Sequence, residues 1–130
     1  MPVHITDRVL LERLVSYDTT SDRSPAELFD FCCDYMDLPS IRITRMKCGD
    51  GYENVLFETG PESVGGTGWM LCGHVDTVPA LEPDWESDPH ELTERAGRLH
   101  ARGACDMKGF DAIALNFLRS RARDGFDQPL

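Results

Sequence analysis

The spacing of apolar residues along the chain predicts three amphipathic helices. Residues 5–17 place apolar side chains on one helical face, namely Ile5, Val9, Leu10, Leu14 and Tyr17. A second helix should begin at Ser24-Pro25-Ala26-Glu27, because a hydroxyl cap and a proline favour a helix start. Its inner face is formed by Leu28, Phe31, Cys32 and Tyr35. A third helix follows Gly109 and ends at Gly125, with its apolar face at Phe110, Ile113, Ala114, Phe117 and Leu118.

Other apolar runs predict strands. Residues 41–46 alternate apolar and polar side chains, as do residues 54–57, and the turn Gly49-Asp50-Gly51 would join them into a hairpin. The continuous apolar run at residues 69–72 is typical of a strand that is covered on both faces in a sheet.

The remaining segments complete an alternation of helices and strands. Residues 79–97 are rich in Pro, Asp and Glu and indicate a surface loop, and residues 98–101 form a short extended stretch. The predicted fold class is therefore α/β, a partial sheet flanked by helices.

Length and charge restrict the class of protein. The 130 residues allow one domain at most, and 13 Lys+Arg against 23 Asp+Glu give a net charge of −10. Without a basic cluster, such a chain repels phosphate backbones, so nucleic acid is not an expected partner. No apolar run approaches the roughly 18 residues of a membrane helix, and the start lacks a signal peptide pattern, which favours a cytoplasmic protein without a membrane partner.

The cysteines give no sign of a structural zinc site or a disulfide framework. Their number is odd and none forms a Cys-x-x-Cys pair; they are Cys32, Cys33, Cys48, Cys72 and Cys105. We expect reduced and mostly buried thiols.

The first junction with candidate chemistry follows the apolar run at residues 69–72. His74 and Asp76 are two residues apart, so in an extended segment both project to the same side, at the end of the strand where α/β sheets bind ligands. An imidazole binds divalent metals, and a carboxylate can accept its other ring N–H. Taken alone, the pair is equally compatible with an ordinary turn.

The second junction lies directly before the third helix. Asp106 stands in a loop flanked by glycines and is a candidate second metal ligand, although a helix cap is an alternative role. Lys108, taken alone, is expected to be an ordinary solvated lysine.

Together the two junctions belong to an ordered series. Its members are Gly73-His74-Val75-Asp76-Thr77-Val78-Pro79, Trp85, Asp88-Pro89, Leu99 and Asp106-Met107-Lys108-Gly109-Phe110. This series resembles the co-catalytic zinc peptidase family that contains acetylornithine deacetylases, succinyl-diaminopimelate desuccinylases and carboxypeptidase G. The resemblance also includes residues 14–21, and so covers most of the chain.

The resemblance implies a role for each candidate residue. His74 would ligate one zinc ion, Asp106 would bridge two zinc ions, and Asp76 would orient His74 as part of the catalytic site. Co²⁺ is a possible substitute metal. The family reaction is amide hydrolysis, and the family also has a cis peptide bond after the bridging aspartate, here between Asp106 and Met107.

The given sequence differs from the family in length, because it ends at Leu130. In relatives a Glu-Glu pair, which supplies the general base and a zinc ligand, follows shortly after the position of Leu130, and further ligands come later. This pair and the inserted lid domain with its dimer interface are absent. We therefore expect residues 1–130 to be the amino-terminal portion of an α/β/α zinc-hydrolase catalytic domain, inactive by itself.

Residues 76–79 and Phe110 are most similar to the acetylornithine deacetylase branch. The resemblance thus implies removal of the acetyl group from N2-acetyl-L-ornithine, a small N-acyl amino acid of arginine biosynthesis, by a homodimer whose interface this chain lacks. The alternatives are a desuccinylase or another aminoacylase or carboxypeptidase of the family, and a non-catalytic metal-binding or interaction fragment.

Overall fold

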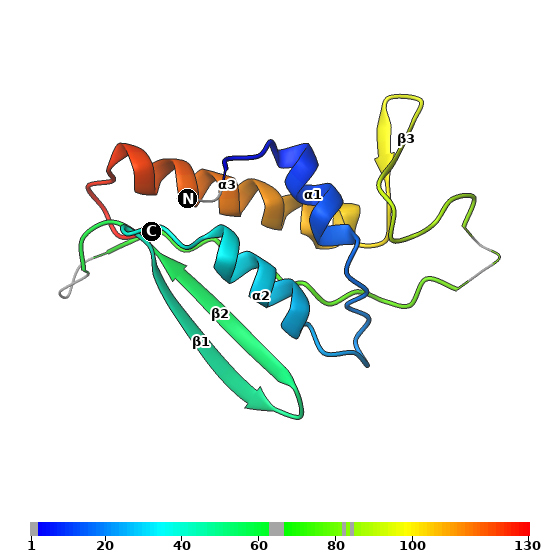
Figure 1. The fold of residues 1–130 in the computed structure, drawn as a ribbon, viewed down its shortest axis with the longest axis horizontal. Helices are drawn as coiled ribbons and strands as arrows, with labels where there is room; N and C mark the ends of the chain where they lie inside the picture. The colour runs from blue at the N-terminus through cyan, green and yellow to red at the C-terminus, as the bar shows by residue number, and fades with distance from the viewer. Residues whose placement is uncertain (1–2, 63–66, 82, 84) are drawn as a thin grey trace.

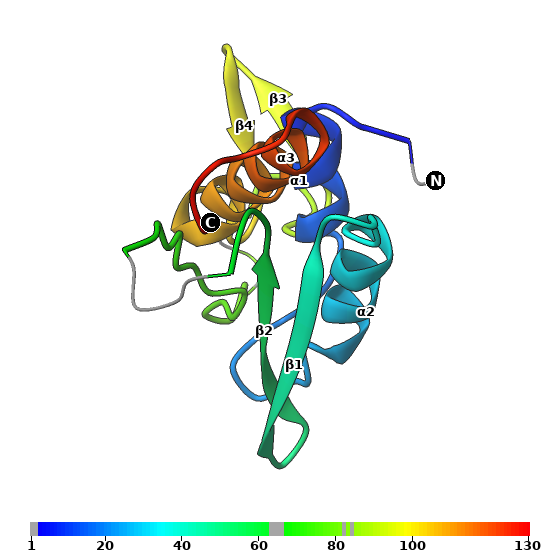
Figure 2. The same ribbon diagram turned by 90° about the vertical axis from the view of Figure 1, so that its left-hand side faces the viewer.

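The computed structural model describes residues 3–62, 67–81, 83 and 85–130. Three helices lie side by side, and two antiparallel hairpins project from them in opposite directions (Figures 1 and 2). The elements are α1 (Asp7–Val15), α2 (Ala26–Tyr35), β1 (Arg42–Gly49), β2 (Tyr52–Glu58), β3 (Thr93–Arg95), β4 (Arg98–His100) and α3 (Gly109–Asp124). This mixture of helices and small sheets confirms the predicted α/β class. None of the helices among the described residues is long and apolar enough to cross a membrane.

Helix α1 confirms the first predicted helix but presents a different face to the core. The Thr6 hydroxyl accepts the Val9 N–H at 3.3 Å and so caps the helix start. The buried side chains are Leu10, Leu11, Leu14 and Val15. Val9, predicted to face inward, is exposed, because the buried face of α1 is shifted toward Leu11 and Val15 while Leu10 and Leu14 remain in it.

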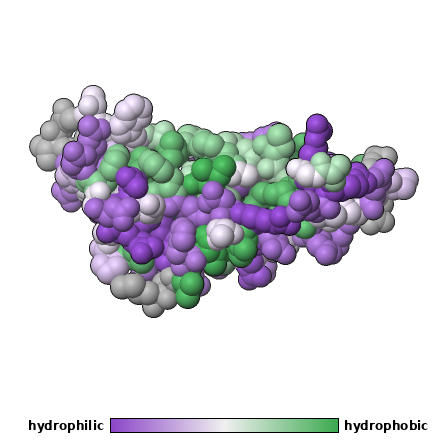
Figure 3. Space-filling model, turned by 90° about the horizontal axis from the view of Figure 1, so that it is seen from above, coloured by the Kyte–Doolittle hydropathy of each residue, from purple (hydrophilic) through white to green (hydrophobic). Residues whose placement is uncertain are grey.

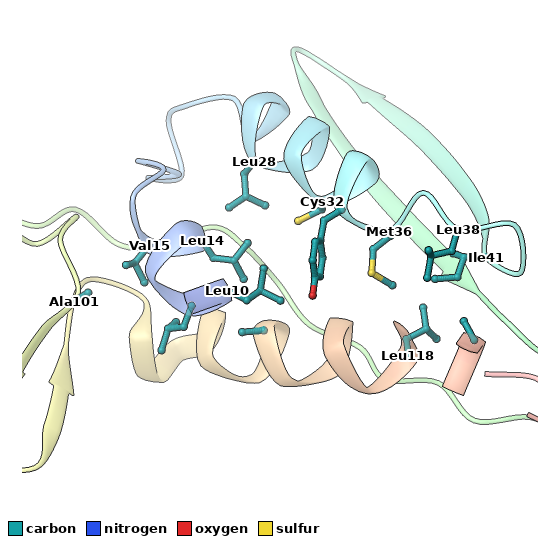
Figure 4. Close-up of a cluster of buried hydrophobic side chains, with 14 residues drawn as sticks. Leu10, Leu14, Val15, Leu28, Cys32, Met36, Leu38, Ile41, Ala101 and Leu118 are labelled. Carbon is teal, nitrogen blue, oxygen red and sulfur yellow. The ribbon is translucent and has the colours of Figure 1, made fainter. Parts of the chain in front are cut away.

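Helix α2 confirms the second predicted helix but begins at Ala26, one residue later than the capping pattern predicts, with Pro25 at the N-cap position and no side-chain capping bond from that residue. The Ser24 hydroxyl accepts the Ala26 N–H at 3.3 Å, and Leu28, Cys32 and Tyr35 face the core. The core lies among the three helices, with side chains of α1, α2 and α3 pointing toward one another (Figure 4). At its centre the Tyr35 hydroxyl donates to Asn116 Oδ1 at 2.6 Å, so a polar pair fixes how α2 lies on α3.

The predicted hairpin is confirmed. Strands β1 and β2 pair antiparallel, with Ile43 opposite Phe57, and the turn contains Gly49 and Gly51 at positive φ. The second hairpin corrects the expected loop at residues 79–97, because Thr93–Arg95 of that segment forms β3 and pairs with β4. The short stretch at Arg98–His100 is extended, as expected.

The strand predicted at residues 69–72 is wrong. Trp69 is 66% exposed and Met70 is 79% exposed, and the segment has no regular secondary structure. A strand requires backbone partners along its edges, and within the described part of the chain each strand is hydrogen-bonded only to the other strand of its own hairpin. Its Trp69 N–H donates instead to the Pro129 carbonyl, at 2.9 Å. The apolar run therefore predicted both the strand and its burial wrongly.

Helix α3 confirms the predicted bounds and corrects the predicted face. Its buried side chains are Ala112, Asn116, Leu118, Arg119 and Ala122. Ile113 is 57% exposed and Phe117 is 44% exposed, although both belong to the expected inner face. The helix therefore has a second apolar side that the described residues leave open. Seen from above, hydrophobic side chains lie exposed among hydrophilic ones along the centre of the molecule (Figure 3).

All five cysteines are free, as expected, but the prediction that most are buried is wrong. Cys48, Cys72 and Cys105 are exposed. Cys48 lies at the turn end of β1 and Cys105 in the turn before α3, while Cys72 belongs to the segment predicted as a buried strand, which has no regular secondary structure.

Candidate metal centre

The structure brings together the three side chains that the sequence singled out. His74 Nε2 lies 3.0 Å from Asp106 Oδ1, across a sequence separation of 32 residues. On the other side of the ring, His74 Nδ1 lies 3.3 Å from Asp76 Oδ1 and 3.1 Å from the Asp76 carbonyl oxygen. The imidazole is thus held between two aspartates, one on each nitrogen.

Asp106 occupies an irregular turn at Ala104–Lys108, directly before α3. Its backbone is not helical, with φ −129° and ψ 91°, and no side-chain capping bond forms at the start of α3. The alternative that Asp106 is merely a helix cap is therefore excluded. The peptide bond between Asp106 and Met107 is cis, as the resemblance implies.

The three side chains line an open pocket of about 300 Å³. Arg102 and Cys105 also line it. Burial lowers the pKa of His74, but its contacts with Asp76 and Asp106 outweigh that effect and hold the pKa above its ordinary value. The pocket is open to small ligands, and the carboxylates of Asp76 and Asp106 attract cations to it.

The donor types suit a shared divalent ion. Zinc lies about 2.0–2.2 Å from nitrogen and oxygen ligands, so two ligands of one tetrahedral ion are separated by about 3.3–3.6 Å. The separation of 3.0 Å between His74 Nε2 and Asp106 Oδ1 is a hydrogen-bond distance, and a small displacement of either side chain would bring the two donors to the separation that a bound ion requires. Asp76 lies on the nitrogen that would not face the metal, where it can accept the Nδ1–H. Within the described residues, however, no group of three or more His, Cys, Asp and Glu side chains is arranged to hold a metal.

Lys108 corrects the prediction of a solvated lysine. Its side chain is only 1% exposed, and its Nζ donates to the Tyr17 carbonyl at 2.9 Å. Burial lowers the pKa of Lys108 to about 8. The sequence could not reveal this burial, because the acceptor lies 91 residues earlier in the chain.

Asp111, which the sequence did not single out, lies behind His74 at the start of α3. Burial raises the pKa of the Asp111 carboxyl to about 6. Its Oδ2 is buried without a hydrogen-bond partner in the described structure. From the sequence, Asp111 could be recognised only as an acidic residue in the first turn of the predicted helix. That position is favourable because of the helix dipole, but it does not indicate burial.

Gly73, directly before His74, packs against this carboxylate. A Cβ at Gly73 would lie 2.0 Å from Asp111 Oδ1. We therefore expect Gly73→Ala to destabilise the fold by about 1–3 kcal/mol, the usual cost of overpacking, as measured by urea unfolding. The Asp111→Ala background is the control, since it removes the obstructing atoms. Equal losses of stability in both backgrounds would refute the explanation by this contact.

Comparison with known proteins was made in three ways. Residues 70–130 match the family described as Peptidase family M20/M25/M40. The chain thus matches a fragment of this peptidase family. It is 36% identical over 115 residues to the acetylornithine deacetylase of Proteus mirabilis (strain HI4320), a match that covers 87% of this chain and 29% of that protein. It is 40% identical over 113 residues to the acetylornithine deacetylase of Myxococcus xanthus, covering 84% of this chain and 29% of that protein.

A solved structure agrees on the fold. The crystal structure of human carnosine dipeptidase 1 superposes with a TM-score of 0.62 at 24% identity, covering 93% of this chain and 29% of that one. The chain thus spans less than a third of the length of these relatives. The similarity shows that the described helices and hairpins follow the fold of a segment of a larger peptidase.

Proposed function

We propose that residues 1–130 are the metal-binding, amino-terminal portion of a zinc-dependent amide hydrolase. Its reaction is removal of the acetyl group from N2-acetyl-L-ornithine, in cytoplasmic arginine biosynthesis. The observation that supports this proposal is the His74–Asp106 pair, 3.0 Å apart with Asp76 on the far ring nitrogen, in a chain whose relatives include acetylornithine deacetylases.

Each residue has a distinct task in this proposal. His74 Nε2 and an Asp106 oxygen hold the metal, and Asp106 has a second oxygen available for another ion. Asp76 accepts the Nδ1–H of His74, which fixes the tautomer and directs the Nε2 lone pair toward the metal. Bound zinc, or cobalt in its place, supplies a Lewis acid for the amide carbonyl. The proposal assigns no further metal ligand and no general base among the described residues.

Two alternative functions differ from the proposed deacetylase. Desuccinylases and other aminoacylases or carboxypeptidases of the family would use the same His74 and Asp106. A non-catalytic metal-binding or interaction fragment is favoured by the two-donor site of the described residues. The coding sequence after codon 130 distinguishes them: a continuing frame with an early Glu-Glu pair supports the enzyme, and an immediate stop codon supports the fragment.

Calorimetric titration with Zn²⁺ tests the metal site in the chain itself. Catalytic zinc normally has three protein ligands, so a site with one imidazole and one carboxylate should bind with micromolar affinity or weaker. His74→Ala should abolish this binding, and His100→Ala, which alters a histidine outside the pocket lining, should leave it unchanged. Two tightly bound zinc ions per chain, or binding that survives His74→Ala, would contradict the proposed site.

A further inference from the structure

We propose that Lys108 and Thr19 are positioning residues for the metal centre. Through residues 17–21 they hold the junction that carries His74 and the junction that carries Asp106 at a fixed separation. The inference rests on the proposed metal-binding function. Both side chains donate to backbone carbonyls, those of Val75 and Tyr17, and so act through the backbone.

Residues 17–21 lie directly against the His74 junction. Thr19 is buried, and its hydroxyl donates to the carbonyl of Val75, the residue between His74 and Asp76, at 2.5 Å. The Thr77 N–H donates to the Thr19 carbonyl at 3.0 Å. Bonds on both sides of Asp76 therefore restrict the backbone that carries the imidazole and its orienting carboxylate.

A third bond extends this pairing. The Ser21 N–H donates to the Thr77 carbonyl at 3.1 Å, and Thr20 and Thr77 form a parallel β-bridge. Residues 19–21 thus serve as a short strand beside residues 75–77. The segment that carries His74 is therefore paired with residues 19–21, whereas residues 69–72 are not paired with a strand.

Lys108 links the same segment to the Asp106 junction. Its ammonium group donates to the Tyr17 carbonyl at 2.9 Å, two residues before Thr19. Its own N–H donates to the Gly103 carbonyl at 2.8 Å, which closes the turn that contains Asp106. One side chain therefore connects the turn of Asp106 to the strand that restrains His74.

The burial of Lys108 indicates that its hydrogen bond to Tyr17 does more than fill space in the core. Burying an ammonium group to 1% exposure is costly, and the hydrogen bond of Lys108 Nζ to Tyr17 is made to a neutral carbonyl. The carboxylates of Asp18 and Asp111 lie near enough to attract the charge and so offset part of that cost. A methionine would fill the same space without this cost, but it could not tether Tyr17.

The test measures Co²⁺ binding by the 130-residue chain, using calorimetry and the visible absorption spectrum of the bound ion. Lys108→Met and Thr19→Val should each weaken Co²⁺ binding about tenfold and alter the spectrum, while circular dichroism shows an intact fold. Lys47→Met is the matched control, since Lys47 is the other lysine of the sequence and is exposed on β1. It should change nothing. The double variant should lose less than the product of the single losses, because both residues act on one segment.

Each outcome decides a different claim. Unchanged Co²⁺ affinity and spectrum in folded Lys108→Met and Thr19→Val would overturn the positioning role and leave the metal site standing. Wild-type binding that does not depend on His74 would overturn the proposed function itself. If Lys108→Met fails to fold, the variants of Thr19 provide the test. Thr19→Ser keeps the hydroxyl and should retain the Co²⁺ affinity that Thr19→Val loses. Equal Co²⁺ affinities of these two variants would overturn the inference.

Discussion

The 130-residue chain, supplied with Zn²⁺ or Co²⁺, should release no detectable ornithine from N2-acetyl-L-ornithine. Within the described part of the chain, the carboxylates that line the pocket are Asp76 and Asp106. In the proposed arrangement Asp76 accepts a hydrogen bond from His74 and Asp106 binds the metal. Neither of these pocket carboxylates is then available as a general base. General acid–base assistance contributes about 10²–10⁴-fold to a reaction rate, and a metal held by only two protein donors contributes less than a fully ligated one.

Chromatographic detection of ornithine, with an active acetylornithine deacetylase as the positive control, provides the measurement. Trace activity that persists in His74→Ala would come from a contaminant. Zinc-dependent ornithine release by the wild-type chain that His74→Ala abolishes would show that the chain contains a base and ligands beyond the residues assigned here.

The chain should also self-associate, and more strongly as salt is added. Ile113 and Phe117 expose an apolar face on α3, and a groove of about 220 Å³ beside it is lined by apolar residues that include Trp69 and Leu115. Exposed surfaces of this kind promote association. The net charge of −10 opposes association, but salt at physiological strength screens charges beyond about 8 Å.

Light scattering across a salt series should show this association. The double variant Ile113→Lys/Phe117→Lys should remain monomeric even though it lowers the net negative charge and therefore the repulsion between chains. Val9→Lys adds a lysine at an exposed apolar position of α1 and should associate like the wild type. A monodisperse wild-type monomer in physiological salt would show that the open apolar face of α3 does not drive contact.

Elements whose partners are close in sequence could be predicted from the sequence. The first hairpin needs only the turn at residues 49–51, and α3 needs only its own periodicity and Gly125. The run at residues 69–72 depends on neighbours that are distant in sequence, so its apolar content alone could not reveal that it is exposed. The same limit explains why the buried faces of α1 and α3 only partly coincide with the predicted ones, since burial depends on which side another element covers.

The candidate site divides in the same way. His74 and Asp76 are adjacent enough for spacing to place them together, whereas Asp106 joins them across 32 residues and could be associated with them only through a resemblance. Lys108 could not be recognised as buried from local sequence, because both its cover and its acceptor come from distant segments. Local chemistry therefore predicted the groups facing the pocket better than those that support it.

Nitrogen-15 NMR of the imidazole rings tests the central claim, that His74 and Asp106 hold a divalent metal, most directly. The sequence contains four histidines, His4, His74, His90 and His100. On addition of Zn²⁺, the Nε2 signal of His74 should move while its Nδ1 keeps the proton that faces Asp76, and the other three rings should not change. Asp106→Asn should weaken that response. A His74 ring that is unaffected by saturating Zn²⁺, or a response at another histidine instead, would contradict the account.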